Sequence, residues 1–293
     1  MRPLSPNDTE QVLTRATKNG SRGWMPRFER RKAPRVVRNP AVREMVPSTV
    51  VGGMRTAILD RVETVRLMED AIMGRLPDLQ YPLFMSSNNG QVLSDFSRNV
   101  DVRKLFHHAD VVSADGQPMV TVARMISKDP LPERVATTDL FDDASMLLPE
   151  GTTYFMLGAT PEEIEKAAAI VRERYPRIRL IGYSHGYLDA EGQEALLRQL
   201  DDLKPDVLWI GMGAPREQEF VVNNLDRLAN VKVIKTSGGL FDFVSGKNRR
   251  APKWMQSLGL EWLYRTILEP KRLAMRYLVT NPHSLYLLFT RTR

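Results

Sequence analysis

The sequence contains no cysteine and no long apolar run. Without cysteine it can form neither disulfides nor thiolate metal sites, which fits a reducing compartment. No apolar stretch approaches the roughly 20 residues of a membrane-spanning helix, and the N-terminal residues lack the apolar core of a signal peptide. We therefore expect a soluble or peripheral protein.

Several ligand-binding motifs are also missing. There is no Walker P-loop and no G-x-G-x-x-G fingerprint, because the run GMGAPREQE begins as G-x-G but continues with Pro215. The D-x-D motif, which commonly holds a divalent metal against the diphosphate of a nucleotide sugar, is absent. The four histidines lack zinc-type spacing. The sequence thus predicts no metal site and no bound cofactor.

Charge is distributed unevenly along the chain. The net charge of +7 combines +7 in residues 1–50, −8 in residues 51–246 and +8 in residues 247–293. Basic ends suit anionic partners, either lipid head groups or nucleic acid, although a solvated basic tail is an equal alternative for the N-terminal segment. Residues 1–45 are rich in Arg, Pro, Asn and Ser, and we predict that they form a basic, disordered extension.

Short apolar strands alternate with amphipathic helices between residues 46 and 250. The expected strands are 46–53, 81–87, 109–114, 152–159, 177–186, 206–215 and 231–239. Single helices between strands, and strands that are apolar almost throughout, are typical of a parallel sheet covered on both faces. We therefore predict an α/β catalytic domain over 46–250, with a doubly wound, mainly parallel, Rossmann-like sheet.

The alternation stops after residue 250. Residues 254–268, 270–280 and 282–291 predict short helices separated by prolines, with aromatic residues interleaved among arginines. This composition suits a membrane interface, whereas a helical cap with solvated arginines is an equal alternative. We predict a helical, basic and aromatic appendage over 251–293 that associates with a membrane.

Candidate functional residues follow the predicted strands, because ligands bind beyond the carboxyl ends of parallel strands. Glycines there let backbone N–H groups approach a phosphate. Asp115 ends one strand and can act as a general base or as a helix N-cap, and Asp242 has the same two interpretations. Arg250 and the C-terminal arginines can meet the charge of a diphosphate, and for each the alternative is a solvated surface position.

Four segments carry a family resemblance: residues 109–120, 157–187, 206–220 and 238–278. They resemble the WecG/TagA/CpsF glycosyltransferases, glycosyltransferase family twenty-six, and the resemblance runs from about residue 47 to 290. The most specific parts are the run GAPREQE, which ends at Glu219, and the run that begins at RAP and continues through GLEWL.

The resemblance implies an inverting, metal-independent glycosyltransferase. Its donor would be a UDP-sugar, with N-acetylmannosamine in the best-known members, and its acceptor a polyprenyl-diphosphate-linked saccharide used for cell-surface polysaccharides. The protein would be cytoplasmic and peripheral at the inner face of the cell membrane. Asp115 falls on the family's proposed base.

The resemblance also implies a substrate site. Ser87 and Asn89 fall on a T-x-N element near the sugar, and the C-terminal arginines match helices thought to close over the active site. The predicted substrate-binding residues are Ser87, Asn89, Gly116, Arg134, Asp139, Gly158, Gly186, Gly213, Pro215, Gln218, Glu219, Gly239, Asp242, Arg250, Arg265, Arg272 and Arg276.

Two departures leave the sugar and the diphosphate contacts open. Thr137 stands where the family often has glycine, and Met275 precedes Arg276 where many members have a second arginine. Two other functions remain possible from the sequence: another nucleotide-binding α/β transferase, such as a methyltransferase, or a non-enzymatic basic adaptor. The acidic middle of the chain argues against a nucleic-acid partner.

Overall fold

The computed structural model describes residues 39–80 and 82–293, so most of the predicted basic extension lies outside the described residues. Its last part is ordered, contrary to expectation. Residues Pro40–Met45 form helix α2, preceded by a buried asparagine, Asn39. The Asn39 side chain donates to the carboxylate of Asp110 over 2.8 Å, and Asp110 also accepts the backbone N–H of Phe84. These contacts attach the segment to the domain.

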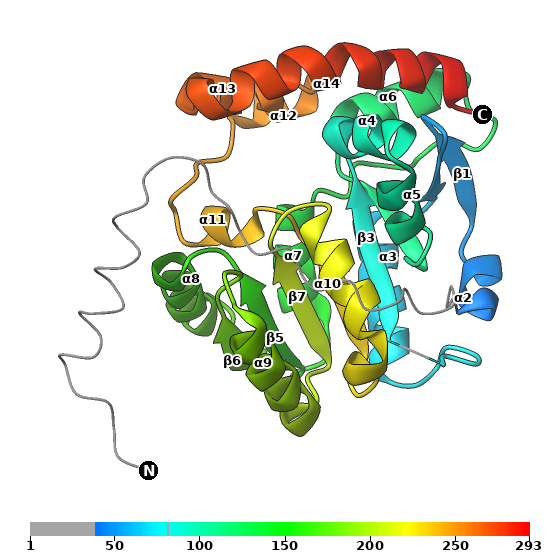
Figure 1. The fold of residues 1–293 in the computed structure, drawn as a ribbon. Coiled ribbons are helices and arrows are strands. Elements are labelled where there is room, and N and C mark those ends of the chain that lie inside the picture. Colours follow the sequence, from blue (N-terminus) through cyan, green and yellow to red (C-terminus); the bar gives the residue numbers. More distant parts are fainter. Residues whose placement is uncertain (1–38, 81) are drawn as a thin grey trace.

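A six-stranded, fully parallel sheet forms the centre of the molecule, in the order β4-β3-β8-β7-β5-β6 (Figure 1). The strands are β3 (Leu83–Asn88), β4 (Val111–Ala114), β5 (Thr153–Gly158), β6 (Arg179–Ser184), β7 (Val207–Gly211) and β8 (Val233–Thr236). The predicted α/β class and parallel sheet are therefore confirmed. The predicted strand at 46–53 lies outside this sheet, because β1 (Ser48–Val51) pairs antiparallel with β2 (Met54–Ala57).

Successive strand residues point to opposite faces of the sheet, and their apolar side chains belong to two separate clusters. Helices therefore cover both faces. Phe155 and Leu157 of β5 belong to one cluster, and Tyr154 and Met156 to the other. The first face carries α4 (Gly90–Arg98), α5 (Val100–Phe106), α6 (Gln117–Ile126), α9 (Ala190–Leu203), α10 (Arg216–Asn224) and the short η1 (Leu225–Leu228). The second carries α2, α3 (Arg61–Ile72), α7 (Thr137–Leu147), α8 (Pro161–Arg174) and α11 (Leu240–Val244).

Helix α7 was not predicted from the sequence. Residues 129–138, which contain two prolines, predict a loop, but α7 begins within them at Thr137. Its N-cap, Ala136, offers no side chain to signal a helix start. Leu140, Phe141 and Ala144 nevertheless bury one face of it against the sheet. Tertiary packing, rather than a local signal, defines this helix.

The C-terminal residues form α12 (Lys253–Ser257), α13 (Glu261–Leu268) and α14 (Pro270–Arg291). The prediction of a break before Pro282 was wrong, since α14 continues through this proline. Pro282 lies on the exposed side of the helix, so neighbouring turns packed on the domain can hold the helix together despite the missing N–H. Leu287 and Leu288 are buried in the first apolar cluster, and the N–H of Gly53 donates to the carbonyl of Arg291.

Gly158 allows β5 and β7 to approach each other closely at their carboxyl ends. A Cβ at this position would lie 2.2 Å from the carbonyl oxygen of Gly211, and the φ of Gly158 is 149°. We expect Gly158→Ala to lower the free energy of unfolding by about 3 kcal/mol, since it combines overpacking with backbone strain. Urea denaturation measures this loss.

Gly213→Ala is the matched control for that substitution. Gly213 also has a positive φ, 81°, but an added Cβ would meet no atom within 4 Å. Its cost should be limited to backbone strain of about 1–2 kcal/mol. Equal losses in the two variants would contradict the interpretation that the close approach of the strands constrains position 158.

Candidate active site

A cavity of about 700 Å³ lies at the carboxyl ends of the parallel strands, where the alternation of strands and helices predicts ligand binding. Residues after β3, β4, β7 and β8 line its floor, and residues of α13 and α14 line the opposite side. Figure 1 shows α12, α13 and α14 lying across this end of the sheet. The volume falls in the range of small-molecule sites in proteins.

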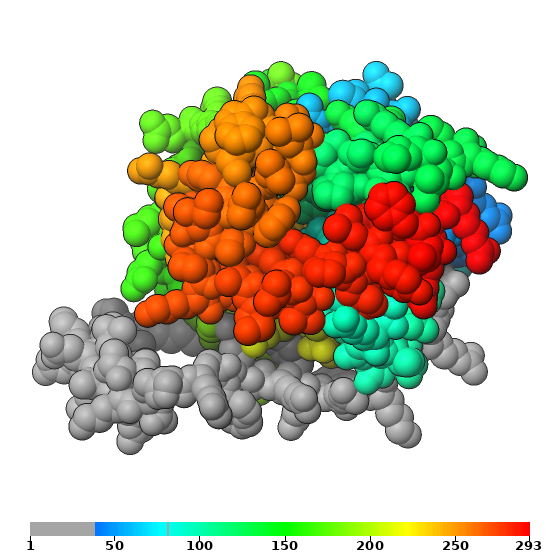
Figure 2. All heavy atoms as spheres, turned by 90° about the horizontal axis from the view of Figure 1, so that it is seen from above, coloured from blue at the N-terminus to red at the C-terminus, as the bar shows by residue number. Residues whose placement is uncertain are grey.

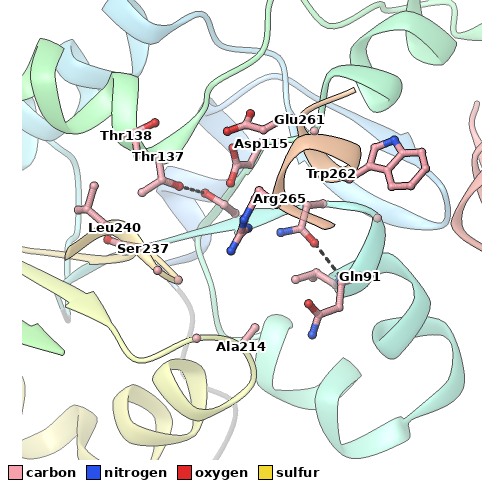
Figure 3. A pocket seen from close by; sticks show the side chains of 18 of the residues that line it. Gln91, Asp115, Thr137, Thr138, Ala214, Ser237, Leu240, Glu261, Trp262 and Arg265 are labelled. Atoms are coloured by element: carbon pink, nitrogen blue, oxygen red, sulfur yellow. Dashed lines mark hydrogen bonds between the residues drawn. The ribbon is translucent and has the colours of Figure 1, made fainter. Parts of the chain in front are cut away.

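Asp115 is the carboxylate at the end of β4 that faces this cavity (Figure 3). Its backbone N–H donates to the carbonyl of Asn88, which continues the pairing of β3 and β4 by one residue. Asp115 does not cap α6: Gly116 occupies the N-cap position, and no side chain caps this helix. The alternative of a purely capping aspartate is thereby removed. Asp242, inside α11, is likewise no cap.

Burial raises the pKa of Asp115 above its ordinary value, and the nearby guanidinium of Arg134 acts in the opposite direction. Arg134 donates from Nε to the backbone carbonyl of Asp115 over 2.6 Å and from Nη2 to Glu261 of α13 over 2.7 Å. Its Nη2 also lies 3.6 Å from Oδ1 of Asp115. Arg134 therefore joins the end of β4 to α13 and leaves the Asp115 carboxylate facing the cavity.

Three arginines of the C-terminal helices line the side of the cavity away from the sheet: Arg265, Arg272 and Arg276. Arg265 lies over the ring of Phe243, and Arg272 pairs with Glu269. Nε of Arg276 is buried and has no hydrogen-bond partner among the described residues. A buried N–H without a partner is costly unless a ligand meets it. This wall suits a diphosphate, for which arginine provides charge-assisted hydrogen bonds.

Glycine loops after β7 and β8 lie beside this wall, and Glu217 holds them together. Its carboxylate accepts the backbone N–H groups of Gly213 and Gly238, over 3.2 and 2.9 Å. Burial raises the pKa of Glu217. Glu217 was not predicted as a site residue, although it lies within the GAPREQE run, because nothing local in the sequence indicates that its side chain turns inward.

A profile of the glycosyl transferase WecG/TagA/CpsF family matches residues 50–293. This chain belongs to that family. The resemblance drawn from the sequence is thus confirmed, and the chain is a glycosyltransferase. Two N-acetylglucosaminyldiphosphoundecaprenol N-acetyl-beta-D-mannosaminyltransferases, from Staphylococcus aureus strains MRSA252 and NCTC 8325 / PS 47, are similar to it. Each is 29% identical over 192 residues, which cover 65% of this chain and 74% of the relative.

Most predicted site residues of this glycosyltransferase come together around the cavity. Those that line it are Ser87, Asn89, Asp115, Gly116, Arg134, Gly186, Gly213, Gly239, Asp242, Arg265, Arg272 and Arg276. Asn89 also caps α4, because its side chain accepts the N–H of Val92. Asp242 pairs with Lys247 over 3.3 Å. Which of these residues contact substrate stays a prediction.

Six predicted residues do not line the cavity: Asp139, Gly158, Pro215, Gln218, Glu219 and Arg250. Arg250 pairs with Asp139 of α7 and donates to Gln256 of α12, so it connects the appendage to the domain. Gln218 is buried, where it donates to Ser86 and Thr236. Asp139, Arg250 and Gln218 thus have their hydrogen-bond partners inside the protein.

Two features are absent from the described part of the glycosyltransferase. No group of three or more His, Cys, Asp or Glu side chains among residues 39–80 and 82–293 could hold a metal ion. Over the same residues, no helix combines the length and apolar character needed to cross a bilayer.

Proposed function

We propose that this glycosyltransferase moves an N-acetylmannosamine-type sugar from a UDP-sugar to a polyprenyl-diphosphate-linked saccharide, with inversion and without a metal ion. The names of its relatives support the donor sugar and the lipid-linked N-acetylglucosamine acceptor. The observation that carries the proposal is the placement of one carboxylate, Asp115, across a cavity from three arginines. Membership of the family favours this function over a methyltransferase or a basic adaptor.

Asp115 acts as the general base in this mechanism. Its carboxylate accepts the proton of the acceptor hydroxyl, and the oxygen forms a bond to the anomeric carbon of the donor sugar. The bond between that carbon and the β-phosphate oxygen breaks, and UDP leaves with the electron pair. Because the attack comes from the face opposite UDP, the anomeric configuration inverts.

The leaving UDP carries charge that the arginine wall can stabilise. Arg265, Arg272 and Arg276 line the cavity, and guanidinium groups can stabilise developing negative charge through charge-assisted hydrogen bonds. The N-terminus of α8, capped by the cavity-lining Thr160, adds a positive helix dipole. These groups supply the role that a metal ion has in other glycosyltransferases.

The site predicts a specific effect of Arg276→Gln. We expect the KM for the UDP-sugar to rise about 10- to 100-fold, because a hydrogen bond to a charged group contributes about 1.5–3 kcal/mol. Steady-state kinetics with a panel of UDP-sugars and a soluble diphosphate-linked N-acetylglucosamine acceptor, in the presence of EDTA, measures this effect. Product mass identifies the transferred sugar.

Arg198→Gln is the control for this experiment, because Arg198 of α9 is exposed, does not line the cavity and pairs with Glu194 of its own helix. It should leave the KM unchanged. An unaltered KM in Arg276→Gln would contradict the proposed diphosphate wall. Activity that requires magnesium or manganese would contradict the metal-independent mechanism.

We also place the outer face of the C-terminal helices against the cytoplasmic surface of the membrane. Seen from above, α12, α13 and α14 cover much of one end of the molecule, with α6 alongside (Figure 2). Exposed apolar side chains on these helices include Trp254, Ile267, Met275, Leu278 and Phe289. The segment from residue 247 also carries a net charge of +8. Apolar side chains with surrounding basic residues suit an anionic bilayer surface.

A further inference from the structure

Lys235 is a lysine buried completely inside the central sheet. It lies on β8, in register with Met85 of β3 on one side and Trp209 of β7 on the other, and its exposed fraction is 0%. Lysine is almost never fully buried unless its charge has partners. The rest of this buried strand carries no charge, because Val233 and Ile234 are apolar and Thr236 is a neutral polar residue.

The ammonium group of Lys235 reaches the floor of the active site. Nζ donates to Oγ of Ser87 over 2.7 Å and to the backbone carbonyl of Thr236 over 2.9 Å. Ser87 lines the cavity, and its Oγ is 3.4 Å from Oγ1 of Thr137 at the start of α7. Lys235 thus lies beneath the floor of the cavity and contacts it through Ser87.

The chemistry of this contact sets the direction of the serine hydroxyl. An ammonium group has donors only, so Ser87 must accept the hydrogen bond from Lys235. The hydroxyl hydrogen of Ser87 then points away from Nζ, toward the cavity or toward Thr137. Ser87 is therefore prepared to donate to an oxygen atom of a bound sugar.

The charge of Lys235 also acts on the proposed base. The charged groups that influence Asp115 are Arg134, Glu261, Lys235 and Arg250. Arg134 also forms an ion pair with Glu261, and Arg250 forms one with Asp139. Lys235 has no ion pair among the described residues, and its charge is balanced at longer range by Asp115 and Glu217. It therefore favours the carboxylate form of Asp115 from the sheet side.

We propose that Lys235 is a positioning residue of sugar transfer: it fixes the Ser87 hydroxyl as a donor toward substrate, and its positive charge favours the carboxylate form of Asp115. This inference rests on the proposed function, in which Asp115 is the base. Lys235 itself touches no substrate, because it is buried beneath Ser87 and does not line the cavity.

The pH dependence of kcat/KM tests the electrostatic part. In the wild type, burial lowers the pKa of Lys235 to about 8, so activity should fall as the pH rises through this value and the ammonium is lost. Lys235→Met should remove this alkaline limb. It should also move the acid limb upward, because losing a nearby cation raises the pKa of Asp115. A purely structural lysine would move neither limb.

A double-mutant cycle with Ser87→Ala tests the positioning part. We expect each single substitution to lower kcat about tenfold or more, as for a positioned hydrogen bond. Lys235→Met should cost much less in the Ser87→Ala background, because the hydroxyl that it orients is gone. Ser87→Thr, which keeps the hydroxyl, should retain activity.

Lys235→Gln provides a second variant if methionine disrupts packing. Glutamine can still donate to Ser87 but carries no charge, so it should remove the alkaline limb and raise the acid limb with little loss of kcat at the optimum. UDP-induced thermal stabilisation, unchanged in both variants, verifies the fold. This inference would be overturned if neither limb of the pH profile moved and the losses in kcat were additive in the double-mutant cycle. An active Asp115→Asn variant would instead overturn the proposed function on which it rests.

Discussion

Replacement of Asp115 by asparagine is expected to lower kcat about 100- to 10,000-fold, the usual contribution of a positioned general base. Asparagine has nearly the same shape but cannot take the proton of the acceptor hydroxyl. The substitution should not unfold the protein, because Arg134 keeps its hydrogen bonds to Glu261 and to the backbone carbonyl of residue 115. Binding of UDP should therefore persist while turnover is lost. Initial rates and UDP-induced thermal stabilisation measure the two effects separately.

Asp143→Asn is a closely matched control. The side chains of Asp115 and Asp143 are 26% and 29% exposed, each lies near an arginine, and burial raises the pKa of both. Asp143 lies on α7 and does not line the cavity. It should keep wild-type turnover. Turnover near the wild-type level in Asp115→Asn would remove this residue from the role of base.

The pKa of Asp115 adds a prediction about the wild type. A base must be deprotonated, so activity falls as the pH drops through its pKa. Because burial raises that pKa above the ordinary value, the acid limb of kcat/KM should lie at a higher pH than for a solvated aspartate. This limb should vanish together with the activity in Asp115→Asn.

Hydrophobic patterning was sufficient to predict the sheet, because buried parallel strands are apolar on both sides. The strands β3 to β8 all fall within or overlap predicted segments. The rule that ligands bind beyond the carboxyl ends of strands then placed Asp115, Ser87 and the glycine loops at one edge. These predictions succeed because a local pattern and a topological rule determine them.

Other features depend on contacts that are distant in sequence. Arg250 pairs with Asp139, which lies 111 residues earlier in the sequence. The residues next to Arg250 therefore could not indicate that its guanidinium already has a partner. Lys235, beneath the cavity, and Glu217, which lines it, become informative only through their burial. Helix α7 depends on packing, and α14 passes through Pro282 because the rest of the helix packs on the domain. Such features need the assembled fold.

The outer face of α14 allows a direct test of membrane association. Its exposed apolar residues recur at helical spacing, at Met275, Leu278, Val279, Tyr286 and Phe289, and so form one stripe. Deleting the whole appendage would be a poor test, because Leu287 and Leu288 on the opposite side belong to the apolar core. Substitutions confined to the stripe avoid this problem.

Replacing Met275, Leu278 and Phe289 together by glutamate should reduce partition onto anionic vesicles about 100-fold or more. These side chains are 56–70% exposed in the free protein, so the fold loses little. Three apolar anchors that insert into a bilayer contribute more than about 3 kcal/mol in total, and the new negative charges are repelled by anionic lipid. Co-sedimentation with phosphatidylglycerol vesicles measures the loss.

Activity with two acceptors separates membrane docking from catalysis. The triple variant should lose most turnover with a vesicle-embedded acceptor and keep it with a water-soluble diphosphate-linked sugar, because the stripe faces away from the cavity. The matched control replaces Met73, Val100 and Met146, which are 56–58% exposed elsewhere on the domain, and should still bind vesicles. If the α14 variant binds vesicles as well as this control does, the stripe is not the membrane-facing surface. If it instead changes the oligomeric state without altering vesicle binding, a second copy of the chain covers the stripe.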